Sequence, residues 1–113
     1  MNLSLLEMFS LMVFGHALAD YPLQGEFLAK SKNRTAPVPG MPWYQALAAH
    51  AIIQGGFVGI ITGSLPLAVA ETVVHAITDD LKCRGKLGFN ADQFIHIGSK
   101  FLWCALHFLV LRH

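Results

Sequence analysis

The stretch WYQALAAHAIIQGGFVGIITG, residues 43–63, decides the fold that we predict. It follows Pro42, whose missing N–H is least costly at the first turn of a helix. It is also long enough to cross the hydrocarbon layer of a bilayer, which takes about 20 residues. Gly55, Gly59 and Gly63 recur along it at four-residue spacing, which is typical of close helix packing in lipid. The stretch therefore predicts a transmembrane helix.

The composition of the whole chain also favours a membrane protein. Of its 113 residues, 54% are hydrophobic and 13% are charged, whereas an ordinary soluble domain has about 25% charged residues. A small soluble protein needs polar side chains to cover its large relative surface. The formal net charge of +1 provides no broad basic surface, so we exclude nucleic acid as a partner. Cys83 and Cys104 lack metal-ligand spacing and are predicted to be free thiols.

Three further apolar segments complete a single membrane domain over residues 1–113. The four predicted helices cover residues 3–29, 43–63, 66–82 and 91–111. We expect the first to kink at Pro22, because proline cannot donate a backbone hydrogen bond. The predicted fold class is therefore all-α, a four-helix transmembrane bundle.

The linkers between these helices predict the orientation of the bundle. The second linker carries no charged residue. Basic side chains lie in the first linker, and others lie at the start of the third linker or within it: Lys30, Lys32, Arg34, Lys82, Arg84 and Lys86. By the positive-inside rule these two linkers are cytoplasmic, so the protein is multi-pass with both termini outside.

Polar and ionisable side chains recur along the predicted helices, many at the four-residue spacing that places them on one helix face. They are His16, Asp20 and Gln24, then His50, then Glu71, His75, Asp79 and Lys82, and finally Asp92, Gln93 and His96. Because successive helices alternate in direction, all of these sets fall in the cytoplasmic half of the bundle. An ionisable residue costs about 2.5–3.5 kcal/mol at a bilayer centre, so we predict one shared site.

The histidine and aspartate residues in this set indicate a metal site. Imidazole nitrogens and carboxylate oxygens bind zinc, manganese or iron, and two of them four residues apart can reach one ion. The predicted ligands are His16, Asp20, His75, Asp79, Asp92 and His96. We expect one or two divalent ions, zinc before manganese or iron. Two are favoured because the candidates outnumber the four ligands of a tetrahedral ion.

Three more residues are assigned catalytic roles. His50 is expected to act as a ligand or base, and Glu71 as a general base or an outer ligand. Lys82 would neutralise an anionic group that arrives from the cytoplasmic surface. Together these residues predict a metal-dependent hydrolase of a lipid or lipid-like ester or phosphoester at the cytoplasmic leaflet.

Non-enzymatic alternatives use the same residue types. A buried network of ion pairs could fix the helix packing, or the polar groups could carry protons or ions. The chain could also modify a host envelope by binding a partner. Conduction would require an oligomer, for which the glycines of residues 43–63 offer an interface between copies. Stoichiometric metal would distinguish the hydrolase from these alternatives.

The order of these motifs resembles an uncharacterised family of small polytopic bacterial and phage membrane proteins, defined only as a domain of unknown function. The matching positions are His16, Asp20, Gln24, His50, His75, Asp79, Lys82, Asp92, Gln93 and His96. The likeness covers nearly the whole chain, and it departs from the family at Tyr21 and Pro22, where an apolar pair is expected. The resemblance implies a bacterial or phage origin and a polytopic fold, but no activity. We expect the chain to lie in the bacterial inner membrane. In motif style alone the chain is also similar to metal-dependent hydrolases of that membrane.

Overall fold

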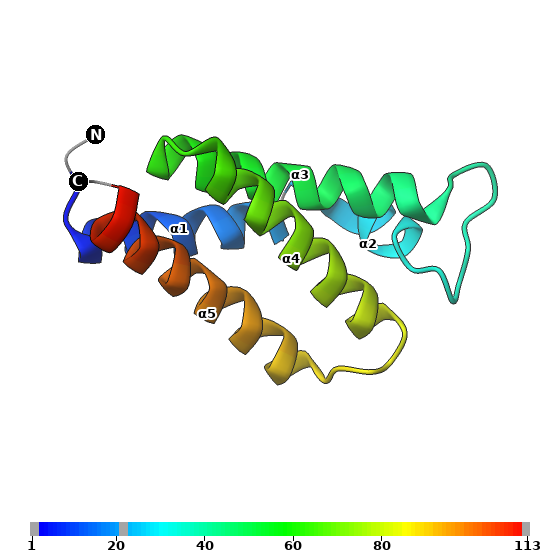
Figure 1. Ribbon diagram of the computed structural model, residues 1–113. Helices are drawn as coiled ribbons and strands as arrows, with labels where there is room; N and C mark the ends of the chain where they lie inside the picture. The colour runs from blue at the N-terminus through cyan, green and yellow to red at the C-terminus, as the bar shows by residue number, and fades with distance from the viewer. Residues whose placement is uncertain (1–2, 21–22, 112–113) are drawn as a thin grey trace.

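The computed structural model describes residues 3–20 and 23–111. These residues form five α-helices and one terminal π-helical turn (Figure 1). The elements are α1 (Leu5–Asp20), α2 (Gly25–Ser31), α3 (Trp43–Thr62), α4 (Leu65–Cys83), α5 (Phe89–Leu106) and η1 (His107–Leu111). Within the described ranges there is no β-strand, so the predicted all-α class is confirmed.

Local sequence determines where α3 ends and α4 begins. The last turn of α3 closes at Gly63, which has a left-handed φ of 69° and donates its N–H to the carbonyl of Gly59 at 2.8 Å. Glycine adopts this conformation without steric cost. Ser64 then caps α4, because its Oγ accepts the N–H of Leu67 at 3.3 Å. Since only Gly63 and Ser64 connect the two helices, α3 and α4 run antiparallel.

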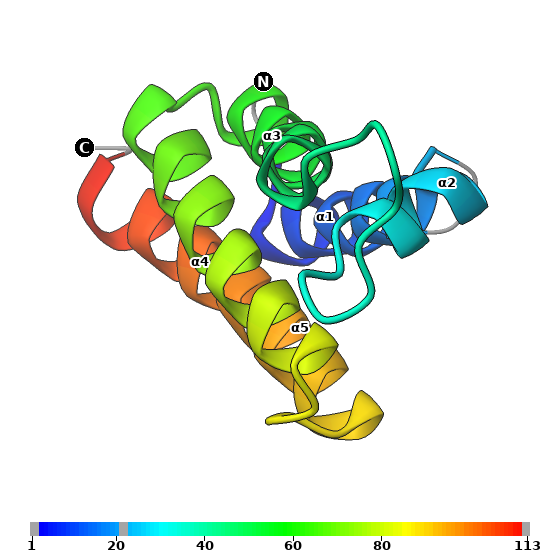
Figure 2. The same ribbon diagram turned by 90° about the vertical axis from the view of Figure 1, so that its right-hand side faces the viewer.

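The helices form an elongated bundle with principal extents of 47, 24 and 22 Å. α3 packs against α1 and α4, and α5 lies beside α4 (Figure 1). The pair α4 and α5 runs obliquely to α1 and α3 (Figure 2). The start of α1 and the turn η1 lie at one end of the bundle, and the 32–42 and 84–88 connections lie toward the other (Figure 1). The two basic linkers are therefore on the same side.

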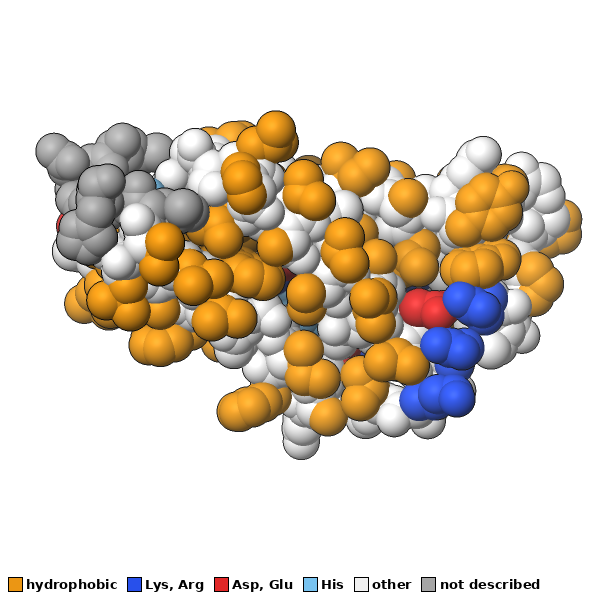
Figure 3. All heavy atoms as spheres, in the orientation of Figure 1, with side chains coloured by type: hydrophobic (Ala, Val, Ile, Leu, Met, Phe, Trp, Pro, Cys, Tyr) orange, Lys and Arg blue, Asp and Glu red, His pale blue; other side chains and the backbone are white. Residues whose placement is uncertain are grey.

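The bundle buries charged side chains and exposes large apolar ones. Glu71 and Lys100 are each 1% exposed, whereas Leu6 is 74% exposed and Phe94 is 80% exposed. Figure 3 shows hydrophobic side chains over most of one face, with lysine and arginine gathered where the basic linkers lie. Such an extended apolar exterior is unusual for a soluble monomer.

One helix has the length and hydropathy of a membrane span. Among the helices in the described ranges only α3 meets both criteria, with a mean hydropathy of 1.3. The core helix of a soluble protein has the same two properties. By these criteria the structure supports one of the four predicted transmembrane helices.

The helix predicted over residues 3–29 is divided, and this prediction was wrong. α1 ends at Asp20, and α2 begins at Gly25, whose φ of 66° is left-handed. The kink predicted at Pro22 lies outside the described residues. Apolar residues continue after the break, at Leu23 and Phe27, so hydropathy alone did not reveal it. Residues 3–20 and 23–111 consequently form five α-helices instead of the four predicted.

Gly55 and Gly59 allow α3 to approach α4 closely. A Cβ atom at Gly55 would lie 2.7 Å from the carbonyl oxygen of Ala68, and one at Gly59 would lie 3.0 Å from the Cβ of Ala68. These glycines therefore serve helix packing within the chain. The homo-oligomer that we predicted through the glycines of this helix stays a prediction.

Candidate metal centre

Four helices direct histidine and aspartate side chains into one buried cluster. Its members are His16 and Asp20 from α1, His50 from α3, His75 and Asp79 from α4, and Asp92 and His96 from α5. Four-residue spacing places the members from α1, α4 and α5 on one face of each helix. The four histidines are between 0% and 4% exposed. The structure thus brings together the six predicted metal ligands and His50.

Three of these side chains form what we call the first ligand group: His50 Nε2, His75 Nε2 and Asp79 Oδ2. The two nitrogens are 3.1 Å apart, and they lie 3.3 and 3.4 Å from the carboxylate oxygen. An imidazole nitrogen makes only one hydrogen bond, so hydrogen bonding alone does not account for all three short distances. Tetrahedral ligands at about 2.0–2.1 Å from zinc are separated by about 3.3–3.4 Å. The triangle therefore has the size of one face of such a site.

The second ligand group consists of His96 Nε2, Asp79 Oδ1 and Asp92 Oδ1. The imidazole nitrogen lies 3.2 Å from the first oxygen and 3.1 Å from the second. Asp92 Oδ1 is buried and has no hydrogen-bond partner in the described part of the chain, despite this short distance. Asp92 Oδ1 and His96 Nε2 are therefore close without being aligned for a hydrogen bond to each other. Beside this group, His16 Nε2 is 3.3 Å from Asp20 Oδ2.

Asp79 belongs to both groups and Asp20 lies beside the first, and each carboxylate uses both of its oxygens. Asp79 presents Oδ2 to His50 and Oδ1 to His96. Asp20 presents Oδ1 to His50 at 3.1 Å and Oδ2 to the histidine of its own helix. Two sets of three residues bring their ligand atoms within 4.8 Å of one another: Asp20, His50 and His75, and His75, Asp79 and His96. The cluster could therefore hold one metal ion, or two that share carboxylates.

Glu71 orients His75 from the side opposite the cluster. Its Oε2 lies 3.2 Å from His75 Nδ1 and accepts a hydrogen bond from Lys100 Nζ at 2.9 Å, and its Oε1 accepts the indole N–H of Trp103 at 2.9 Å. A carboxylate on the second nitrogen of a ligating histidine fixes the ring and its tautomer. Glu71 therefore lies where an outer ligand would lie, which is one of the two roles that we predicted for it.

Sequence reasoning missed Lys100 and Gln54. Lys100 stands four residues after His96, and Gln54 stands four residues after His50, so helical spacing carried the signal in both cases. Gln54 Nε2 donates to Asp20 Oδ1 at 2.9 Å and so holds a carboxylate of the cluster.

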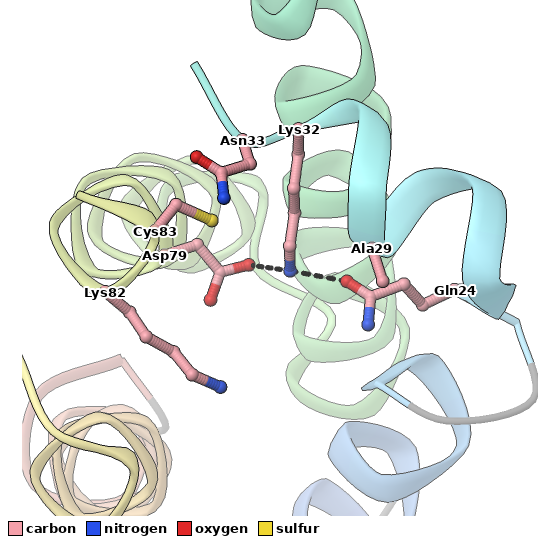
Figure 4. Close-up of a pocket in the computed structure, with 7 residues that line it drawn as sticks. All are labelled: Gln24, Ala29, Lys32, Asn33, Asp79, Lys82 and Cys83. Atoms are coloured by element: carbon pink, nitrogen blue, oxygen red, sulfur yellow. Dashed lines mark hydrogen bonds and ion pairs between the residues drawn. The ribbon is translucent and has the colours of Figure 1, made fainter. Parts of the chain in front are cut away.

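A cavity of about 300 Å³ lies beside the cluster, between the ends of α2 and α4 (Figure 4). Asp79 forms part of its wall, and Lys32 and Lys82 line it. Lys32 Nζ donates to Asp79 Oδ2 at 2.7 Å and to Gln24 Oε1, while Lys82 Nζ lies 3.4 Å from Asp92 Oδ2. The sequence placed Lys82 near an incoming anion, whereas for Lys32 it indicated chiefly a role in membrane topology and, as the lesser alternative, binding of anionic lipid headgroups.

Comparisons with protein-family profiles, with curated proteins and with solved structures found no match to this chain. We therefore infer the function from the geometry of the cluster and its cavity.

Proposed function

We propose that this chain is a membrane-embedded, metal-dependent hydrolase with zinc at its centre. The observation that carries the proposal is the first ligand group, in which His50, His75 and Asp79 place three ligand atoms 3.1–3.4 Å apart. Catalytic zinc sites use three protein ligands and keep a further position for water or substrate. Mixed nitrogen and oxygen donors favour zinc over magnesium or calcium, which prefer oxygen alone.

The chemistry follows from the groups around this position. A zinc ion would polarise an ester or phosphoryl oxygen and activate water. The water oxygen bonds to carbon or phosphorus, the bond to the alcohol oxygen breaks, and that oxygen gains a proton. Asp20 turns Oδ1 toward the centre, 3.1 Å from His50 Nε2, and its second oxygen, Oδ2, is placed to accept the proton that water releases. Glu71 holds the ring of His75 in its ligating orientation.

The membrane placement is inferred from the exterior and from the basic linkers. The apolar exterior suits lipid, and α3 has the length and hydropathy of a span. By the positive-inside rule, the end with the 32–42 and 84–88 connections faces the cytoplasm and both termini face outward. The cavity opens near that end, so the substrate would be a lipid or lipid-like molecule of the cytoplasmic leaflet. The bacterial or phage origin that the family resemblance implies would make that membrane the bacterial inner membrane.

The metal content of detergent-purified protein tests this proposal. We expect stoichiometric zinc in the wild type and almost none in His75→Ala or Asp79→Asn. Glu26→Gln is the matched control, because its carboxylate is 80% exposed and lies outside the cluster. Zinc-dependent release of phosphate or fatty acid from lipid micelles would then establish hydrolysis. A wild type without bound metal after metal-replete growth would refute the proposal.

A second candidate function is proton conduction, since polar contacts continue from the cavity into the bundle. Lys32 bonds to Asp79 at 2.7 Å, Asp79 lies 3.4 Å from His75, and His75 lies 3.2 Å from Glu71, which pairs with Lys100. Chains of such groups relay protons in membrane proteins. Proton flux in metal-free proteoliposomes, without hydrolysis, would favour this function over the enzyme.

A further inference from the structure

The cavity beside the candidate metal centre is lined by basic side chains from two helices. Lys32 directly follows α2, and Lys82 lies in the last turn of α4. Figure 4 shows both side chains extending into the space between these helices, with Asp79 between them. The volume of about 300 Å³ is near the lower limit of ligand pockets. A small polar group could therefore reach the centre and both ammonium groups at once.

Lys32 is unusually buried for a lysine and still has a free donor. Its side chain is 11% exposed, and its ammonium makes two hydrogen bonds with described residues, to Asp79 and Gln24. An ammonium has three donors, so one remains for a ligand in the cavity. Burial of a charge is costly without a partner of opposite charge. Asp79 supplies that partner, but a metal ion bound to Asp79 would compete for its charge.

The summed charge of the cavity and the adjoining cluster would change sign if one divalent cation bound. The carboxylates of Asp20, Asp79 and Asp92 outnumber the ammonium groups of Lys32 and Lys82. A single divalent cation makes the sum positive. Positive charge enclosed by surroundings of low dielectric attracts small anions more strongly than it does in water. The loaded centre is therefore expected to take an anionic ligand.

We propose that the cavity binds the phosphate group of a phosphomonoester, with Lys32 and Lys82 on its oxygens. This inference rests on the proposed function, which leaves the choice between an ester and a phosphoester open. Lysine binds phosphate as a point charge. The cavity is too small for acyl chains, which would lie outside it near the exposed Leu23 and Phe27 of the α2 region.

The reaction at this subsite is the hydrolysis of one phosphorus–oxygen bond. A water oxygen bonds to phosphorus, and the bond to the alcohol oxygen breaks with its electron pair left on that oxygen. One water proton reaches the alcohol oxygen through Asp20. The products are the free alcohol and inorganic phosphate, so inorganic phosphate is itself a ligand of the subsite.

Calorimetric titration of inorganic phosphate into zinc-loaded, detergent-purified protein tests the inference. We expect saturable binding to the wild type, weakened at least about tenfold in Lys32→Gln and in Lys82→Gln, because each loses a charge-assisted hydrogen bond. Lys86→Gln is the control, since Lys86 is exposed and does not line the cavity. Zinc content is measured in every variant. Lys82 is 38% exposed, so its replacement disturbs the interior less than the replacement of Lys32, which is 11% exposed.

Titration with phosphatidic acid in detergent micelles identifies the source of the phosphate. Diacylglycerol, which lacks the phosphate group, is titrated as the control. Tighter binding of phosphatidic acid than of inorganic phosphate supports a lipid headgroup, and the reverse supports a soluble phosphate ester. The inference is overturned if zinc-loaded wild type binds no phosphate, or if both lysine variants bind it like Lys86→Gln. Phosphate binding without hydrolysis of any ester would instead overturn the proposed function alone.

Discussion

The same helices enclose two regions of opposite character. Toward the start of α1 and the end of α5, an apolar core includes Met8, Met12, Val58 and Cys104. Farther along the helices lies the cluster of histidine and aspartate side chains. The apolar core is held by many weak contacts, none of which depends on a particular partner. In the cluster, each charged group depends on specific partners, because an unpaired buried charge is costly. Replacing one residue should therefore have different consequences in the two regions.

Glu71 and Lys100 lie where the two regions meet. Trp103 belongs to both, because its ring packs in the apolar core while its Nε1 donates to Glu71 at 2.9 Å. Lys100 is 1% exposed and its ammonium pairs with the same carboxylate at 2.9 Å. This ion pair lies at the border of the polar region and orients His75 within that region.

The largest effect is expected for Lys100→Met. The variant leaves the buried carboxylate of Glu71 without its cation, and breaking a buried pair in this way costs about 3–5 kcal/mol. The double variant Glu71→Gln with Lys100→Met removes both charges and should recover most of the lost stability. Denaturant-induced unfolding in detergent, followed by circular dichroism, measures both. If the single variant is as stable as the wild type, the pair does not hold the two regions together.

Much of the fold could be predicted from periodicity and hydropathy. The all-helical class and the apolar stretch that became α3 followed from residues 43–63. The break after Asp20 could not be placed, because the apolar pattern continues beyond it at Leu23 and Phe27. Hydropathy records what a residue prefers to contact, and it does not record where the backbone turns.

The cluster was predictable in its membership but not in its geometry. Four-residue spacing predicted which histidine and aspartate residues share a helix face, and alternating helix directions brought those faces together. Sequence could not show that Asp79 divides its two oxygens between His50 and His96, which depends on how α3, α4 and α5 cross. It also could not show that Lys32 turns inward to Asp79, because this depends on how α2 packs.

A smaller effect, of about 2–5 kcal/mol, is expected for Met12→Ala in the apolar core. Met12 is 1% exposed and its Sδ lies 3.4 Å from Cys104 Sγ, so the shorter side chain leaves a cavity. The variant should unfold at lower denaturant concentration while keeping the zinc content of the wild type. Phe14→Ala, in the same helix but 69% exposed, is the control and should lose little stability. Loss of zinc in Met12→Ala would show that the two regions are not independent.

The smallest effect is expected for a change within the polar cluster itself. Gln54→Leu keeps a similar volume but removes the hydrogen bond of 2.9 Å to Asp20 Oδ1. Removing an outer residue of a metal site lowers metal affinity by about 10–100-fold, and the lower value is expected here because Asp20 keeps its contact with His50. Stability without metal should fall by only about 1 kcal/mol, because Asp20 Oδ1 loses one hydrogen bond but keeps its contact with His50. Competition with a chromogenic zinc chelator measures the affinity, and thermal unfolding of the metal-free protein measures the stability. An unchanged affinity with reduced stability would mean that Gln54 supports helix packing and that Asp20 is not a ligand.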